Sequence, residues 1–159
     1  MTMDAEAVRR GVEALIGDYA EVIDEDRLEA WPDLFGDPCK YLVICRSNFE
    51  AGMRQGVMYA ATQGMLRDRV FSLRKANIYE PHRYRHVVGP IRIKSTEDGT
   101  AVVHTHFICA RIMQDGETSL FATGRYLDRI DISAEPYRFT ERIVVIDSEK
   151  IDTLLAIPL

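Results

Sequence analysis

The stretch MLRDRVFSLRKANIYEPHRYRHVVGP, from Met65 to Pro90, predicts a helix that runs through a polar elbow into a strand. Its helical half places Leu66, Val70 and Leu73 at i, i+4 and i+7, which is the spacing of one apolar helix face. The basic side chains of this half stay off that face; they are Arg67, Arg74 and Lys75. We therefore expect the helix to pack against the rest of the chain through its leucine and valine stripe.

The second half of the stretch changes the direction of the chain. Asn77 follows the last apolar position and is expected to close the helix in the left-handed conformation, and Pro81 prevents the helix from resuming. The residues from Tyr84 to Gly89 must then leave the elbow as a strand. This order makes the stretch a joint between the last major helix and the first long strand.

Length and composition indicate an ordinary globular protein. A chain of 159 residues is expected to form one domain, over residues 1–159, around one hydrophobic core. Its 47% hydrophobic and 28% charged residues are typical of soluble proteins. The acidic, helix-like N-terminal segment does not resemble a secretory signal, and no apolar run is long enough to span a bilayer. We expect a cytoplasmic protein.

Charge and cysteine usage exclude two further classes. A net charge of −5 argues against nucleic acid as the main partner, because phosphate binding needs an extended positive surface. The arginines between positions 67 and 85 are therefore expected to pair with carboxylates of this chain or of a neighbour. Cys39, Cys45 and Cys109 form an odd set without paired spacing, which favours buried thiols over disulfides.

Helical patterns dominate the first part of the chain. Apolar residues at helical spacing predict a helix from Asp4 to about Asp24. A short second helix is expected from Asp24, at an acidic cap, until just before Pro32. The β-forming run Lys40–Cys45 predicts a strand, whereas residues 48–63 give mixed signals and are expected to be mostly loop.

Strands separated by turns dominate the rest of the chain. Asp-Gly turns favour hairpins, so consecutive strands are expected to be antiparallel neighbours. Asp152–Leu155 is expected to form one helical turn near the C-terminus. The predicted strands are His86–Lys94, Ala101–Met113, Glu117–Ile132 and Tyr137–Ile146.

Helices followed by an antiparallel meander predict an α+β fold, with about three N-terminal helices on one face of a curved sheet. Strands of this length are expected to curl into a cone, with Gly124 as the site of a bend. In the predicted strand Ala101–Met113, alternation places Val103 and Phe107 on one face and Val102 and Ile108 on the other. Because both faces are apolar, one is expected to join the core and the other to need a partner.

The histidines suggest one possible metal site. His104 and His106 form an H-x-H pair on one face of a strand, a spacing that can hold a metal ion. A third ligand is not implied by the neighbouring sequence, and the common Cys-and-His zinc patterns are absent, so we favour two ordinary strand residues. His82 and His86 are expected to be hydrogen-bonded residues of the elbow.

A second possibility is an active site inside the cone. Tyr19, Asp24 and His86 could converge there as acid, base and orienting group. The alternative is that Tyr19 belongs to the core, Asp24 caps or ends a helix, and His86 anchors the elbow. We favour this alternative, because sequence alone does not show that the three side chains meet.

Three phrases of the sequence together resemble one family, the small (β) subunits of Rieske non-haem-iron aromatic-ring-hydroxylating dioxygenases. They are Met65–Val70, Arg83–Gly89 and Phe121–Asp128, and the similarity in length and element order extends over nearly the whole chain. Shorter phrases resemble members that act on an aromatic acid, with terephthalate as the candidate substrate; they are Asn77–Glu80, Arg111–Met113, Gly116–Thr118 and Asp152–Leu159.

This resemblance implies a cone-shaped fold like that of nuclear transport factor 2, and a structural subunit without catalytic residues. It implies a β trimer within an α3β3 hexamer, whose large α subunits hold a 2Fe–2S Rieske cluster and a mononuclear Fe(II). The complex would insert both atoms of O2 into the ring to give a cis-dihydrodiol. Electrons would come from NAD(P)H through a reductase, with or without a ferredoxin.

The resemblance also bears on individual residues. The cluster ligands of the α subunit follow C-x-H and C-x-x-H patterns, and none of the cysteines here has a histidine at either spacing, so no cofactor is expected in this chain. Arg69, Arg85 and His86 match the family's helix, elbow and strand phrase, which implies a role in structure and assembly. The alternatives are a free-standing isomerase or dehydratase of the same fold, or a small-molecule binding module.

Overall fold

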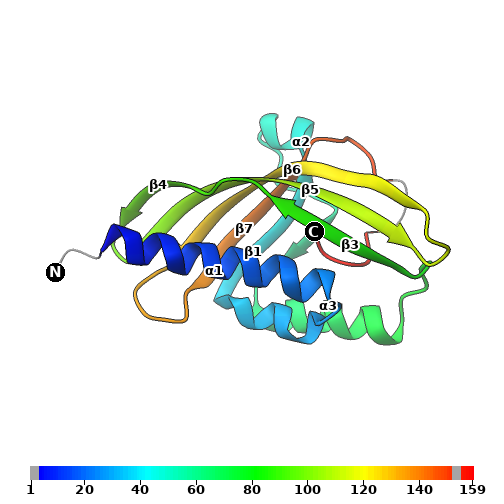
Figure 1. Ribbon diagram of the computed structural model, residues 1–159, viewed down its shortest axis with the longest axis horizontal. Helices are drawn as coiled ribbons and strands as arrows, with labels where there is room; N and C mark the ends of the chain where they lie inside the picture. The colour runs from blue at the N-terminus through cyan, green and yellow to red at the C-terminus, as the bar shows by residue number, and fades with distance from the viewer. Residues whose placement is uncertain (1–3, 152–154) are drawn as a thin grey trace.

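The computed structural model describes residues 4–151 and 155–159 and shows one long curved sheet with helices along one face (Figure 1). Helices α1, η1 and α3 lie on the inner face of the sheet, and the short helix α2 lies on the outer face (Figure 1). The elements are α1 (Ala5–Asp24), the 3-10 helix η1 (Leu28–Leu34), β1 (Phe35–Cys45), α2 (Arg46–Glu50), β2 (Met58–Ala60), α3 (Gln63–Lys75), β3 (His82–Val88), β4 (Arg92–Glu97), β5 (Thr100–Met113), β6 (Thr118–Asp131) and β7 (Arg138–Ile146).

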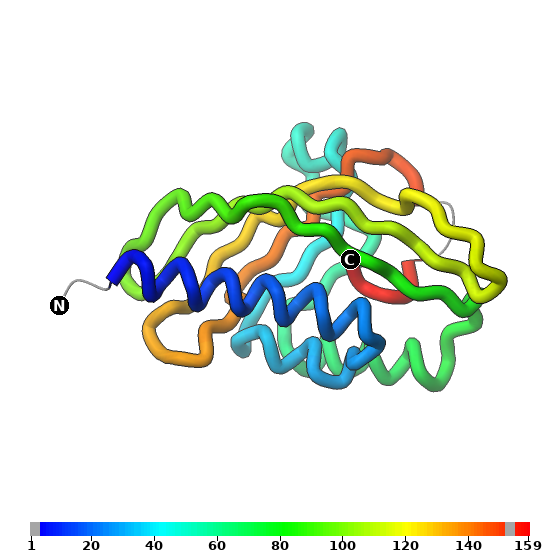
Figure 2. Tube along the Cα trace, in the orientation of Figure 1, coloured from blue at the N-terminus to red at the C-terminus, as the bar shows by residue number. Residues whose placement is uncertain are grey.

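The strands form one sheet in the order β2-β1-β7-β6-β5-β3, and β4 pairs with β5. The antiparallel pair of β5 and β6, with 14 residues in each strand, runs along the length of the molecule. β1 pairs with β7 in parallel, which brings distant parts of the chain side by side (Figure 2). This architecture is the predicted α+β cone with N-terminal helices on a curved sheet.

The first helix, α1, has a capping residue at its N-terminus and an apolar face that packs on the sheet. The Asp4 side chain accepts a hydrogen bond from the amide of Glu6 at 3.1 Å, which caps the N-terminus. The apolar stripe of α1 is buried against the sheet; it consists of Val8, Val12, Leu15, Ile16, Tyr19, Val22 and Ile23. The predicted helix to Asp24 is therefore confirmed.

No helix within the described residues is long and apolar enough to cross a membrane.

The elbow stretch also folds as a helix followed by a strand, but the helix ends differently from the prediction. Leu66, Val70 and Leu73 are buried as expected. The helix closes when the amides of Ala76 and Asn77 both donate to the Ser72 carbonyl at 2.8 Å. Asn77 has no positive φ, so the predicted left-handed closure at this residue is wrong.

Two further boundary predictions are wrong, and a third holds only in part. The second helix is the 3-10 helix η1 and contains Pro32, because buried Trp31 and Leu28 hold this short turn despite the missing proline donor. Residues 48–63 are mostly loop, as predicted, but they also contain the end of α2, all of β2 and the first residue of α3. The expected strand His86–Lys94 is split into β3 and β4, because Pro90 cannot donate a ladder hydrogen bond.

The outer face of the sheet carries a small apolar cluster of its own. Leu42, Ile44 and Val145 are buried there under Phe49 of α2, apart from the main core. On β5, Val103 and Phe107 face the core, whereas Ile108 is 45% exposed on the outer face. The predicted division of β5 into two apolar faces is confirmed. The predicted helical turn at Asp152–Leu155 lies largely outside the described residues.

Gly124 has a role other than the predicted bend. The register of β6 shifts between Arg129 and Ile130 against β7, and between Cys109 and Ala110 against β5, and neither shift falls at Gly124. A Cβ atom at Gly124 would overlap the carbonyl oxygen of Val145 on β7. The glycine is therefore required for the close approach of β6 and β7.

We predict that Gly124→Ala destabilises the protein by about 3 kcal/mol, because a backbone carbonyl cannot move aside as a flexible side chain can. Gly17→Ala is the matched control: Gly17 lies in α1 with nothing within 4 Å of its added Cβ, so the change should stabilise by about 1 kcal/mol. Urea unfolding monitored by circular dichroism measures both. Equal midpoints for the two variants would contradict the close-approach explanation.

Candidate functional site

The strongest polar contact between the helices and the edge of the sheet joins Asp24 to His86. The His86 Nδ1 lies 2.6 Å from Asp24 Oδ1, and the His86 amide donates to Asp24 Oδ2 at 2.8 Å. The Asp24 side chain is 3% exposed and the His86 side chain is 0% exposed. The carboxylate at the end of α1 therefore satisfies a backbone donor of the edge strand β3 and fixes the imidazole at the same time.

Tyr19 does not join this pair. The Tyr19 ring centroid lies 5.9 Å from that of Tyr126, and Tyr126 stacks on Phe107 with centroids 4.4 Å apart. The Phe107 centroid in turn lies 6.1 Å from that of the His86 ring. Two aromatic rings therefore separate Tyr19 from His86. Of the three residues considered as an active site, the fold brings Asp24 and His86 together and places Tyr19 elsewhere in the core.

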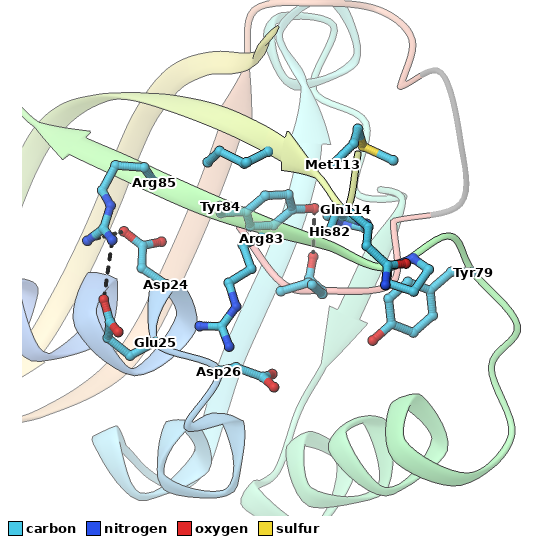
Figure 3. A pocket seen from close by; sticks show the side chains of 13 residues that line it. Asp24, Glu25, Asp26, Tyr79, His82, Arg83, Tyr84, Arg85, Met113 and Gln114 are labelled. Carbon is cyan, nitrogen blue, oxygen red and sulfur yellow. Dashed lines mark hydrogen bonds and ion pairs between the residues drawn. The ribbon is translucent and has the colours of Figure 1, made fainter. Parts of the chain in front are cut away.

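A pocket lies beside this pair and opens to solvent (Figure 3). Its volume is about 520 Å³, and its lining residues are Asp24, Glu25, Asp26, Tyr79, Pro81, His82, Arg83, Tyr84, Arg85, Ile112, Met113, Gln114 and Ile157. His86 is not among them, because its ring turns into the core beside Tyr84 and Phe107. A solute in this pocket would meet the Asp24 and Glu25 end of α1 but not the imidazole.

Arg85 extends from β3 to the acidic end of α1 (Figure 3). Its guanidinium lies 3.3 Å from Glu25 and 4.0 Å from Asp24. The side chain of Arg69 in α3 has no hydrogen bond or ion pair within the described residues, so its predicted bond to a carboxylate or a helix-end carbonyl is not seen there. His82, as predicted, is a hydrogen-bonded elbow residue, with its Nδ1 2.8 Å from the Glu80 carbonyl oxygen.

Arg74 makes the densest set of ionic contacts in the elbow stretch. Its guanidinium donates to both carboxylate oxygens of Glu29, at 2.8 and 3.1 Å, and to the side chain and carbonyl of Asp26, each at 2.9 Å. The hydrogen bond from Arg74 lowers the pKa of Glu29 below its usual value. This contact ties the end of α3 to the turn after α1, where Asp26 has a φ of 57°.

A second ionic pair lies in the centre of the core. Arg142 of β7 donates to both oxygens of Asp128 on β6, at 2.8 and 2.7 Å, with both side chains fully buried. The Arg142 Cζ also lies 4.1 Å from the Tyr19 ring centroid, 3.9 Å from that of Tyr126 and 4.2 Å from that of Phe139. Burial lowers the pKa of Arg142, but the Asp128 charge and hydrogen bonds outweigh it and raise the pKa above its ordinary value.

The remaining candidates do not form a metal site. His104 and His106 share one face of β5, as expected, and it is the outer face. Burial lowers the pKa of His104, and the nearby charges of Lys94 and Arg125 lower it further. Within residues 4–151 and 155–159, no three histidine, cysteine or acidic side chains gather closely enough to hold a metal ion. The local charge at the H-x-H pair is positive, which disfavours a cation.

The cysteines are free thiols, as predicted, although Cys45 is only half-buried while Cys39 and Cys109 are buried. Burial raises the pKa of the Cys109 thiol well above its usual value, so it is not an activated nucleophile. Their sequence neighbours include no histidine at the spacing of Rieske ligands. These residues therefore do not fit an iron–sulfur cluster.

Sequence reasoning missed Asp128 and Arg142. A usable signal was present in β6, where Tyr126, Asp128 and Ile130 alternate with outward-facing residues and so share the inner face. A carboxylate in that register needs a buried cation, and β7 offers Arg142 opposite it. The rule that buried charges are paired would have predicted this contact once strand register was assigned.

We predict that Asp24→Ala destabilises the protein by about 3 kcal/mol, because it leaves two buried donors of His86 unpaired. Glu25→Ala, at the neighbouring half-exposed position, should cost less than about 1 kcal/mol. Urea unfolding of both variants provides the comparison. A smaller loss for Asp24→Ala than for Glu25→Ala would show that the link between α1 and β3 is not the stronger contact.

We also predict a pH-dependent contribution from Arg74. The folded pKa of Glu29 lies below its unfolded value of 4.5, so the contribution is complete above that pH and disappears as pH falls through the lower folded pKa. Arg74→Gln should therefore cost about 0.5 kcal/mol at pH 7 and progressively less in acid. Arg69→Gln, on the same helix, should show no such pH dependence. Thermal unfolding from pH 3 to pH 7 tests the difference.

Comparison with known proteins agrees with the geometry. Residues 19–153 match the model of the ring hydroxylating beta subunit family. The chain is 45% identical over 141 residues to a terephthalate 1,2-dioxygenase terminal oxygenase component subunit beta 2 of Comamonas sp., covering 89% of this chain and 92% of that protein. These matches extend over both the elbow stretch and the long strands.

Solved structures support the same conclusion. A protein of Novosphingobium aromaticivorans, assigned as the beta subunit of an aromatic-ring-hydroxylating dioxygenase, superposes with a TM-score of 0.90 at 37% identity, covering 98% of this chain and 99% of that one. A protein assigned as a scytalone dehydratase from the same organism shares the fold, with a TM-score of 0.68 at 14% identity over 89% of this chain and 85% of that one. The chain belongs to the ring hydroxylating beta subunit family, the β subunits of aromatic-ring-hydroxylating dioxygenases.

Proposed function

We propose that this β subunit is a structural, non-catalytic part of a terminal oxygenase, in which a large α subunit carries out the reaction. The observation that supports this role is the placement of Asp24 and His86. Asp24 lines the adjacent pocket, but the His86 imidazole, which would have to act with it as acid and base, does not, and the buried hydrogen bond between them holds β3 to α1. Residues 1–159 would act as one domain.

We propose that the oxygenase dihydroxylates an aromatic acid, with terephthalate as the leading candidate, to a cis-dihydrodiol during aromatic compound catabolism. The support is the 45% identity to a terephthalate 1,2-dioxygenase β subunit. Electrons would pass from NAD(P)H through a reductase, with or without a ferredoxin, to the α subunit in the cytoplasm. No membrane or nucleic acid takes part in this scheme.

The iron centres of the reaction would belong to the α subunit. We assign a Rieske 2Fe–2S cluster and a mononuclear Fe(II) to that partner, and no cofactor to this chain. Support comes from the cysteines of this chain, which lack histidines at the cluster spacing, and from the inert character of the buried Cys109 thiol. This chain's contribution is then to orient and hold the α subunits.

The assembly we propose is a β homotrimer within an α3β3 hexamer. Several large apolar side chains of this chain face solvent and are available for contacts between subunits; they are Met53, Val57, Tyr59, Met65, Phe71, Ile78, Val87, Ile108 and Leu120. Arg69, which has no ionic partner inside the described chain, is available to a carboxylate of a neighbour. Arg85 and His86 would set the position of the elbow that carries this surface.

We predict that Arg85→Ala reduces recovery of the α–β assembly several-fold, because β3 loses its link to Glu25 at the end of α1. Arg67→Ala is the matched control, since Arg67 is also an exposed arginine that pairs with a carboxylate, Asp33 at 2.6 Å, but this pair joins α3 to η1 rather than to α1 or β3. Co-expression with the α subunit, size-exclusion chromatography and mass photometry measure the outcome. Intact assembly with Arg85→Ala would remove this role for Arg85.

The competing functions are a free-standing isomerase or dehydratase and a small-molecule binding module. The observation that favours an enzyme is the buried hydrogen bond between Asp24 and His86, which resembles an acid–base pair. Purified β subunit alone should contain no iron and show no turnover, whereas the α–β complex should contain iron and oxidise an aromatic carboxylate. Activity of the isolated chain that disappears in His86→Ala would overturn the structural role.

A further inference from the structure

Residues 155–159 enter the cone and are buried there. Leu155 and Ile157 are 6% exposed, Ala156 is 1% exposed and Leu159 is 0% exposed. Figure 2 shows this segment, in red, turning back under the sheet near β3. Its backbone forms no strand pairing within the described residues, so other contacts must hold it in place.

Tyrosine hydroxyls supply the hydrogen bonds to this segment. Tyr41 of β1 donates to the Leu159 carbonyl oxygen at 2.8 Å, and Tyr19 of α1 donates to the same oxygen. Tyr84 of β3 donates to the Ile157 carbonyl oxygen at 3.4 Å. Three different elements therefore direct side-chain donors at two carbonyls, as a binding site does with a ligand, whereas the strands of the sheet pair through their backbones.

The donors are suited to bind an oxygen acceptor at neutral pH. Burial raises the pKa values of Tyr19 and Tyr41, so both phenols keep their protons. The guanidinium of Arg142 lies against the Tyr19 ring and adds positive potential, partly offset by Asp128. Its Nη1 is buried and has no hydrogen-bond partner within the described residues.

The walls around the Leu159 oxygen are aromatic. The ring centroids of Trp31 and Phe35 lie 5.2 Å and 5.9 Å, respectively, from that of Tyr41. Phe35 also contacts the Tyr19 ring, at 6.4 Å. A branched aliphatic side chain such as that of leucine can pack against such walls while the adjacent oxygen reaches the two hydroxyls. The arrangement combines apolar walls with a few convergent polar groups.

We infer that the interior of the cone is a binding pocket for a branched aliphatic group that carries a carbonyl or carboxylate oxygen, and that residues 155–159 are its resident ligand. Tyr19 and Tyr41 bind the oxygen, and the aromatic walls bind the aliphatic part. This inference concerns the inside of the cone and does not rest on the assembly proposed above. Displacement of the segment should open a pocket that accepts a molecule of the same chemistry.

The test uses the full-length chain with the segment displaced. Ile157→Asp combined with Leu159→Asp places two charges at buried positions, which should expel the segment and leave the pocket walls unchanged. Trp31 is the single tryptophan of the chain and is fully buried, so its fluorescence reports on the pocket. We expect red-shifted emission that is restored by the synthetic peptide Leu-Ala-Ile-Pro-Leu, with no response from the unmodified protein.

Two comparisons assign the binding to the proposed groups. Tyr41→Phe in the displaced background should weaken peptide binding about five-fold, the effect of one neutral hydrogen bond. Tyr137→Phe is the matched control, because this half-buried tyrosine lies beside Gly11, and it should bind the peptide unchanged. Tighter binding of the peptide acid than of the peptide amide would identify a carboxylate site, and equal binding would identify a carbonyl site.

A second measurement decides the question if the doubly charged variant does not fold. In the otherwise unmodified chain, Tyr41→Phe should speed hydrogen exchange of residues 155–157 and 159 at least ten-fold without changing exchange in β5 and β6. Exchange of the segment only together with those strands would show that it is an integral part of the core. That result, or a folded displaced variant whose emission the peptide does not restore, would overturn the inference.

Discussion

The bidentate pair between Arg142 and Asp128 is the contact on which the rest of the core depends. Two charges without solvent are tolerated only when each has a well-placed partner, so β6 and β7 must keep the register that sets these residues opposite each other. The same guanidinium lies against Tyr19 of α1 and Phe139 of β7. One cation therefore positions the first helix, two strands and the aromatic core at once.

A second constraint acts at the edge of the sheet. β3 is an edge strand, and Asp24 at the end of α1 accepts the outward amide of His86 while it also holds the imidazole. Arg74 makes a similar link just after α1, because its guanidinium joins α3 to Asp26. These contacts join both arms of the elbow, α3 and β3, to the end of α1. A joint held by several contacts suits a subunit whose proposed role is to present surfaces to neighbours, and the burial of the His86 imidazole agrees with a structural role for the Asp24–His86 pair.

Sequence reasoning succeeded where the signal is local. The helix ending at Asp24 and the stripe of Leu66, Val70 and Leu73 follow from periodicity, and the hairpins of β4 to β6 follow from Asp-Gly turns. It failed where distant contacts override local preference. Pro32 lies inside η1 because its neighbours are buried, and the long strand predicted through Pro90 is two strands, β3 and β4, which pair with different parts of β5.

The sequence by itself determined that helices come before a series of strands, the α+β class and, through motifs such as Arg83–Gly89, the resemblance to ring-hydroxylating β subunits. Only the tertiary structure decided which polar residues meet. Asp24 and His86 are 62 positions apart, and Tyr41 and Leu159 are 118 apart, so no local pattern encodes their contacts. The parallel pairing of β1 with β7 likewise has no turn to signal it. Such contacts arise from the folding of the whole sheet around its helices, because burial, register and charge pairing must be satisfied together.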